Sequence, residues 1–189
     1  IFGTDSPFQK FYQENSYGKV SFSGDVMGWY TLQRNINDYD PNGGYNFHFE
    51  DTEDIVVSNN IDLSQYNRLV VLVNRLKGGI VGFSSVGKHD FNFGSRIYTL
   101  SESIVLVDYW SRIDILNSYL LHEIGHALGL QHAKGWACNN QVLYGDLCYE
   151  DEYGNGFDVM GRGGWSLHFN PLYKEKLGWL EPSQILTIT

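Results

Sequence analysis

The chain has 189 residues, which suits one domain that buries about 70% of the surface its unfolded chain would expose. Its net charge of −9 argues against nucleic-acid binding and against binding to anionic membranes, because both call for basic surfaces. No apolar run approaches the roughly 20 residues that a membrane-spanning helix needs. We expect a monomer with neither nucleic acid nor a membrane as a partner.

The first half of the chain predicts a sheet with irregular connections. The residues of Leu69–Val73 are apolar throughout and mostly β-branched, as in a strand buried on both faces. Further strands are expected, from alternation or β-branched content, at Lys19–Ser23, Trp29–Leu32, Ile97–Leu100 and Ile104–Val107. A short helix is expected at Asn59–Tyr66, and the glycine-rich segment 78–87 is a candidate edge strand.

One long helix follows, beginning near Ser111. Its apolar residues recur at helical spacing and should pack on the sheet: Ile113, Leu116, Leu120, Ile124, Ala127 and Leu128. The helix carries His122 and His126, which are four residues apart and therefore lie on one face. Gly129 can adopt the positive φ that ends a helix, and the turn would bring His132 toward the same point.

These histidines complete an HExxHxxGxxH motif, whose chemistry is that of a catalytic zinc site. Three neutral imidazoles leave one coordination position open, as catalytic rather than structural zinc sites do. Glu123 follows the first histidine and is not needed as a ligand, so it can accept a proton from water and pass it to a leaving amine. A core helix whose histidines bond to backbone is the competing interpretation, and the number of matched positions disfavours it.

The region after the motif is long and irregular. Cys138 and Cys148 would close a short loop in a secreted protein and would be two thiols in the cytosol. The Asn, Gly and Tyr residues around them indicate an exposed loop, which favours the disulfide. Carboxylates in this region offer oxygen ligands for Ca²⁺, although a solvated acidic loop would have the same composition: Asp146, Glu150, Asp151 and Asp158.

The motif, followed by Met160 in the sequence Asp-Val-Met-Gly, resembles the metzincin clan of zinc endopeptidases. Within that clan, residues 115–180 look most like the gametolysin-like (autolysin) family. The supporting features are the motif itself, the Cys-containing loop, His168-Phe-Asn170 and Lys176-Leu-Gly-Trp-Leu180. Residues 1–110 offer no motif to compare.

The resemblance implies a single α/β (α+β) metalloprotease catalytic domain over residues 1–189. Residues 1–129 would hold a twisted, mostly parallel sheet of about five strands with the active-site helix. Residues 130–189 would form a smaller irregular subdomain with a Met-turn around Met160 and a C-terminal helix at Pro171–Leu177. Zinc would be held by the three histidines, and a protein or peptide substrate would pair with an edge strand of the sheet.

Two features depart from the clan. Some metzincins carry a Tyr two residues after the Met, where this chain has Arg162. Tyr149 and Tyr153 are candidate substitutes, although a buried Tyr with a satisfied hydroxyl is the favoured interpretation of both. Relatives are made with an inhibitory propeptide that often acts through a Cys, and no third Cys occurs here. We therefore expect a secreted, extracellular enzyme whose propeptide has been removed, or one held latent in another way.

His168, near the Met-turn, is expected to shape a specificity pocket rather than to bind zinc. Trp165 and Phe169 have two interpretations, the lining of the same pocket and core packing. Alternative functions also stay open at this point. The chain could hydrolyse non-peptide amide bonds in cell-wall material, or it could be an inactive metzincin-like binding module. The intact Glu123 argues against the binding module, and the lack of a fourth nearby protein ligand argues against a structural zinc domain.

Overall fold

The computed structural model describes residues 3, 5–34, 38, 45–75, 81–108, 113–138, 148–163, 167–186 and 188. It is a mixed α/β structure, as expected, and it divides into two compact units. We call Gly24–Gly129 the sheet unit, and Ile1–Ser23 together with Leu130–Thr189 the terminal unit. No helix in the described ranges is both long and apolar enough to cross a bilayer.

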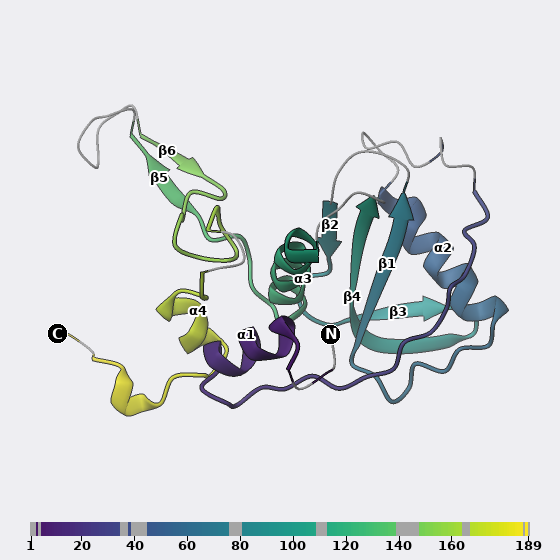
Figure 1. Cartoon of the computed structure of the whole chain (residues 1–189), viewed down its shortest axis with the longest axis horizontal. Helices are drawn as coiled ribbons and strands as arrows, with labels where there is room; N and C mark the ends of the chain where they lie inside the picture. The colour runs from purple at the N-terminus through teal and green to yellow at the C-terminus, as the bar shows by residue number, and fades with distance from the viewer. Residues whose placement is uncertain are drawn as a thin grey trace. The chain divides into compact units, whose positions relative to one another are not determined.

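A small sheet forms the centre of the sheet unit (Figure 1). Its long strand is β4 (Arg96–Asp108). The second half of β4 pairs with parallel β1 (Arg68–Arg75) on one side and with antiparallel β2 (Val81–Ser84) on the other. The first half of β4 pairs with antiparallel β3 (His89–Phe93). Strand β2 is therefore at an edge of the sheet in the part of the chain that the structure describes.

This sheet differs from the mostly parallel, five-stranded sheet that the resemblance implies. Among the described residues it has four strands, and one of its three pairings is parallel. The reason is partly local, because the turn of Gly94 and Ser95 joins β3 to β4 and so short a connection makes neighbouring strands antiparallel. The two strands predicted at Ile97–Leu100 and Ile104–Val107 are parts of one continuous strand.

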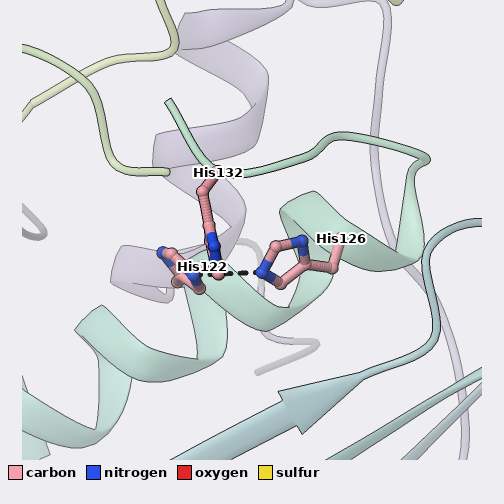
Figure 2. A group of neighbouring side chains, drawn as sticks. All are labelled: His122, His126 and His132. Atoms are coloured by element: carbon pink, nitrogen blue, oxygen red, sulfur yellow. Dashed lines mark hydrogen bonds between the residues drawn. The ribbon is translucent and has the colours of Figure 1, made fainter. Parts of the chain in front are cut away.

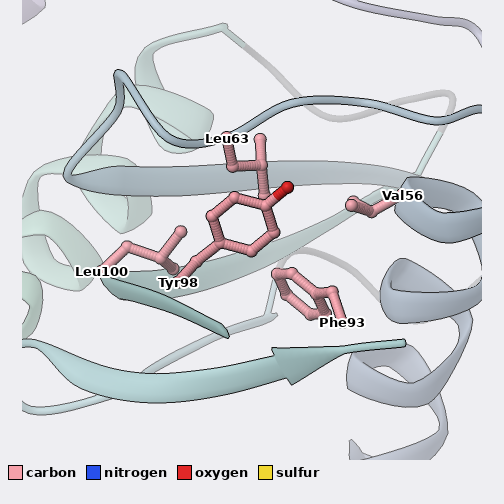
Figure 3. Close-up of a cluster of buried hydrophobic side chains, with 5 residues drawn as sticks. All are labelled: Val56, Leu63, Phe93, Tyr98 and Leu100. Carbon is pink, nitrogen blue, oxygen red and sulfur yellow. The ribbon is translucent and has the colours of Figure 1, made fainter. Parts of the chain in front are cut away.

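Two helices lie on opposite faces of the sheet (Figure 1). Helix α2 (Tyr45–Ser58) places Val56 in a buried cluster with side chains from β3, β4 and the loop after α2 (Figure 3). Helix α3 (Ile113–Ala127) contacts β2 and β4 on the other face. Side chains alternate along a strand, so the two faces of β4 supply separate contacts for the two helices.

Aromatic side chains form the core of the terminal unit. Helix α1 (Pro7–Asn15) begins where Ser6 accepts a hydrogen bond from the Gln9 N–H at 3.2 Å. The ring contacts of this core involve Phe8, Phe11, Tyr12, Phe22, Phe169 and Trp179. The buried Asn15 side chain accepts from the Phe169 N–H at 2.9 Å and thereby joins α1 to the chain just before α4 (Pro171–Lys176).

The rest of the terminal unit is a short hairpin and a short helix. Strand β5 (Gly135–Ala137) pairs with antiparallel β6 (Tyr149–Asp151). A 3-10 helix follows α4 at Pro182–Gln184. Helix α4 confirms the C-terminal helix predicted at Pro171–Leu177 and ends one residue earlier.

The predicted strand Lys19–Ser23 is wrong, because a side chain takes the place of a partner strand. The Gln9 amide oxygen accepts from the Phe22 N–H at 3.1 Å, and the Gln9 amide nitrogen donates to the Phe22 carbonyl. Trp29–Leu32 also lies outside any strand, with Trp29 largely exposed. Aromatic and β-branched content favours a strand only where a neighbouring strand can pair with it.

The short helix predicted at Asn59–Tyr66 is also wrong. Helix α2 ends at Ser58, and Asn60 has a φ of 50°, which stops the helix. Beyond it, the Asp62 carboxylate accepts from the Ser64 N–H at 2.9 Å. Aspartate stabilises turns in this way, and the local hydrogen bond competes with a helix.

Candidate metal centre

Helix α3 confirms the helix predicted over the first two histidines of the motif. Their Nε2 atoms lie 3.1 Å apart, so both imidazoles point to one place (Figure 2). Glu123, which follows His122 on the same helix, is buried, with 3% of its surface exposed.

The helix ends as the sequence predicts. Gly129 has a φ of +99°, a conformation that glycine adopts without strain. Its N–H and the N–H of Gly87 both donate to the His126 carbonyl, at 2.7 and 2.9 Å. These bonds satisfy a carbonyl in the last turn of the helix and hold the backbone of the second histidine.

The chain after Gly129 brings a third imidazole to the other two (Figure 2). One ring nitrogen from each of His122, His126 and His132 lies within 4.8 Å of the others. Among the described residues, this is the group of histidine, cysteine and carboxylate side chains whose spacing could hold a metal ion.

The donor set suits a small divalent cation. Imidazole nitrogens bind zinc at about 2.0–2.1 Å, so tetrahedral ligand atoms stand about 3.3 Å apart. The 3.1 Å separation of the His122 and His126 Nε2 atoms is close to that value. Two neutral ring nitrogens that face each other at this distance need a proton or a cation between them, and a cation bound by both rings would meet that need.

Glu123 lies in a dry environment beside the first histidine. Burial raises the pKa of Glu123 to about 8. Its Oε2 atom has no hydrogen-bond partner among the described residues. A cation at the histidines would stabilise the carboxylate and lower its pKa. Such a group can exchange a proton near neutral pH.

A glycine of the edge strand gives Glu123 its space. A Cβ atom on Gly82 would lie 2.4 Å from Glu123 Oε1 and 2.6 Å from its Cγ. Any side chain at position 82 would therefore move the carboxylate. The contact places the end of Glu123 against the backbone of β2.

Hydrogen bonds within the terminal unit hold the third histidine. The Tyr173 hydroxyl donates toward the carbonyls of Gln131 and His132, at 2.9 and 2.8 Å. The His132 Nδ1 atom lies 2.8 Å from Oε1 of Glu152. The rings of His132 and Tyr153 are in contact, with centroids 3.9 Å apart.

The predicted Met-turn residue is fully buried, with no exposed surface at Met160. Its carbonyl accepts from the Ala133 N–H at 2.8 Å, directly after the third histidine. Asp158, also buried, accepts from the N–H groups of Met160 and Asn170, both at 2.6 Å. The Asp158 carboxylate, considered above as a Ca²⁺ ligand, is thus hydrogen-bonded to two backbone N–H groups.

The predicted disulfide is present between Cys138 and Cys148. The acidic residues considered for Ca²⁺ do not converge in the described part of the chain. Glu150 pairs with Lys134 at 2.6 Å and Asp151 with Arg162 at 2.9 Å. Asp146 lies outside the described residues.

The aromatic residues near the Met-turn occupy different environments. Phe169 packs in the aromatic core of the terminal unit and is 2% exposed. His168 is part of the surface, where its Nε2 lies 3.3 Å from a carboxylate oxygen of Glu14. Trp165 lies outside the described residues. Tyr149 is exposed on β6, and Arg162 forms the ion pair described above.

The contact of Gly82 with Glu123 and the contact of Glu152 with His132 could not be predicted from the sequence. Gly82 lies within the predicted edge-strand segment, but nothing in the sequence pairs it with Glu123. Glu152 belongs to an acidic run, and its contact with His132 depends on the fold of the hairpin.

Comparisons with protein-family models, with curated protein sequences and with solved structures found no match.

Proposed function

We propose that this chain is a zinc-dependent endopeptidase of the metzincin type, similar to the gametolysin-like family. The observation that carries the proposal is the convergence of three imidazoles beside a buried glutamate. Three nitrogen ligands with an open position and an adjacent carboxylate are what metal-assisted hydrolysis requires. The motif spacing and the buried Met160 support the same assignment.

The three histidines would hold the zinc, which when bound acidifies water and polarises a carbonyl oxygen. Glu123 accepts the proton of the attacking water and later donates it to the departing amine nitrogen. Burial suits Glu123 to both steps, because a carboxyl group in a dry site binds and releases a proton nearer neutral pH.

An extended peptide is the substrate class that the sheet favours. Strand β2 pairs with β4 along one edge, and its other edge faces no strand in the described residues. Main-chain pairing along such an edge is a general mode of peptide recognition. Because Gly82 of β2 touches Glu123, a peptide on this strand would lie near the proposed base.

We also propose that the protein acts outside the cell. The Cys138–Cys148 disulfide supports this location, because disulfides persist in oxidising compartments. The expected substrate is then an extracellular protein or peptide.

The test is cleavage of an unfolded protein by wild type and by Glu123→Gln, with the zinc content of both samples measured. The variant should bind zinc and fold normally, and its rate should fall at least about 10²-fold because the proton acceptor is gone. His126→Ala is the matched ligand variant and should lose both zinc and cleavage. A Glu123→Gln protein that cleaves at the wild-type rate would exclude the proposed mechanism.

A further inference from the structure

The β5–β6 hairpin carries an acidic residue to the third histidine. Glu152 follows β6 directly, and its Oε1 lies 2.8 Å from His132 Nδ1. The next residue, Tyr153, covers the same imidazole, with the ring planes inclined by 37°. One side of His132 is therefore occupied by two consecutive residues of this turn.

The structure of the hairpin fixes where Glu152 lies. The register pairs Gly135 with Asp151, and the disulfide closes the hairpin next to its other end. The turn after β6 is closed by the Gly154 N–H, which donates to the Asp151 carbonyl at 2.9 Å. The chain is then bonded to the residue after His132, because the Asn155 N–H donates to the Ala133 carbonyl at 3.0 Å.

Close backbone packing restricts this turn further. A Cβ on Gly135 would lie 2.7 Å from the carbonyl carbon of Gly154. The two glycines allow β5 and the turn to approach, which keeps Glu152 beside the segment that carries His132. The contact between carboxylate and imidazole thus follows from the backbone and not from side-chain reach alone.

A hydrogen bond from Nδ1–H to a carboxylate determines which imidazole nitrogen can bind a metal. The proton is held on Nδ1, and the lone pair that can bind a cation is then on Nε2. The carboxylate also fixes the ring orientation and raises the basicity of the ligand.

We propose that Glu152 is a positioning residue of the metal centre, which holds His132 as the Nδ1–H tautomer and directs its Nε2 to the ion. This inference rests on the three-histidine zinc site of the proposed function. It does not require that the substrate be a peptide.

The hairpin contains a matched control. Glu150 has the same charge, lies two residues earlier on β6 and is ion-paired with Lys134 at 2.6 Å. Both glutamates are well exposed, with 62% of the Glu152 and 58% of the Glu150 side chain accessible. Neutralising either one removes the same charge from the same hairpin, and only Glu152 contacts a histidine.

The experiment measures zinc affinity of the metal-free wild type, Glu152→Gln and Glu150→Gln by competition with a chromophoric chelator. Removing such a carboxylate costs about 10–100-fold in metal affinity, and the exposure of Glu152 places it near the lower value. We expect about tenfold weaker binding for Glu152→Gln and unchanged binding for Glu150→Gln. Equal affinities in all three proteins, or an equal loss in both variants, would overturn the inference.

A second measurement works without metal and separates positioning from a general structural role. Nitrogen NMR of metal-free protein should show His132 as the Nδ1–H tautomer in wild type and in Glu150→Gln. In Glu152→Ala the Nε2–H form should gain population, with the melting temperature unchanged. An unchanged tautomer would refute the positioning role.

The outcomes also separate this inference from the proposed function. Zinc binding that weakens in Glu152→Gln, in a protein that cleaves no peptide, would retain the inference and reject the endopeptidase. A wild-type protein that binds no zinc would reject both. Normal cleavage with an unaffected Glu152→Gln affinity would reject the inference alone.

Discussion

The placement of Glu123 depends on the absence of a side chain across from it. Its carboxylate occupies space that a Cβ on Gly82 would take, and the nearest atoms belong to the flexible end of Glu123. Position 82 therefore requires glycine because Glu123 occupies the space beside it, and not because of the backbone conformation. The φ of Gly82 is not in the left-handed region. Substitution at position 82 should displace the proposed base while the strand stays paired.

We therefore expect Gly82→Ala to fold and to bind zinc with wild-type affinity while cleavage slows by about 10²-fold. A displacement of about 1 Å in a reacting group has effects of this size. The measurement combines peptide cleavage, zinc content and melting temperature. Gly156→Ala is the control, because a Cβ there meets nothing within 4 Å. Wild-type cleavage by Gly82→Ala would show that Glu123 tolerates the shift.

The Met-turn depends on one buried aspartate. Asp158 accepts hydrogen bonds from two backbone N–H groups. One belongs to Met160 within the turn, and the other to Asn170, which caps α4. Burial raises the pKa of Asp158, while these hydrogen bonds lower it. Gly161 lies in the same turn, where a Cβ would meet the Asn155 carbonyl oxygen at 2.1 Å. Substitutions at Asp158 and Gly161 should therefore disturb the turn.

Asp158→Asn should lower the free energy of unfolding by about 2–3 kcal/mol, because an amide offers one acceptor where the carboxylate offers two. The measurement is urea or thermal unfolding of metal-free protein. Asp5→Asn is the control, since Asp5 is exposed and forms a surface ion pair with Lys10 at 3.2 Å. An equally small effect of both substitutions would show that Asp158 does not stabilise the turn.

At the scale of the whole molecule, a buried acid separates two apolar clusters of the sheet unit. One cluster includes Leu100 (Figure 3) and the other includes Ile104, both in β4 and on the same face. Glu102 lies between them in sequence, shares that face by alternation and is 1% exposed. Neither of its carboxylate oxygens has a hydrogen-bond partner among the described residues. Burial, and to a smaller extent the charge of Glu53, raises the pKa of Glu102 to about 8.

This pKa predicts how stability changes with pH. In the unfolded chain Glu102 loses its proton near its ordinary pKa of 4.5, whereas in the folded chain it keeps the proton until about pH 8. The contribution of Glu102 is therefore most favourable below pH 4.5, declines between 4.5 and 8, and is lost above. The difference corresponds to about 5 kcal/mol at most.

Glu102→Gln should remove this decline, so the variant should gain stability over wild type as the pH rises from 4.5 to 8. The measurement is urea unfolding of both metal-free proteins across that range, in which the contribution of Glu123 cancels. Glu53→Gln is the control and should retain most of the decline, because it removes only the smaller cause. Parallel pH profiles for wild type and Glu102→Gln would contradict the prediction.

Several errors in the sequence-based fold have one physical origin. Lys19–Ser23 alternates like a strand, but Gln9 satisfies the backbone of Phe22. Helix α1 was not predicted, because residues 7–15 show no clear apolar period, and its buried face is defined by the distant Phe169 and Trp179. Local patterns cannot show which distant group will occupy a hydrogen bond or cover a side chain.

The sequence by itself determined the features that arise from short spacings. Helical periodicity gave α3 and the shared face of His122 and His126, glycine gave the helix end at Gly129, and loop composition favoured the Cys138–Cys148 disulfide. The tertiary structure decided the mixed sheet, the contact of Gly82 with Glu123 and the contact of Glu152 with His132. Those contacts join residues from separate elements, so they depend on how whole strands and hairpins pack and not on any local pattern.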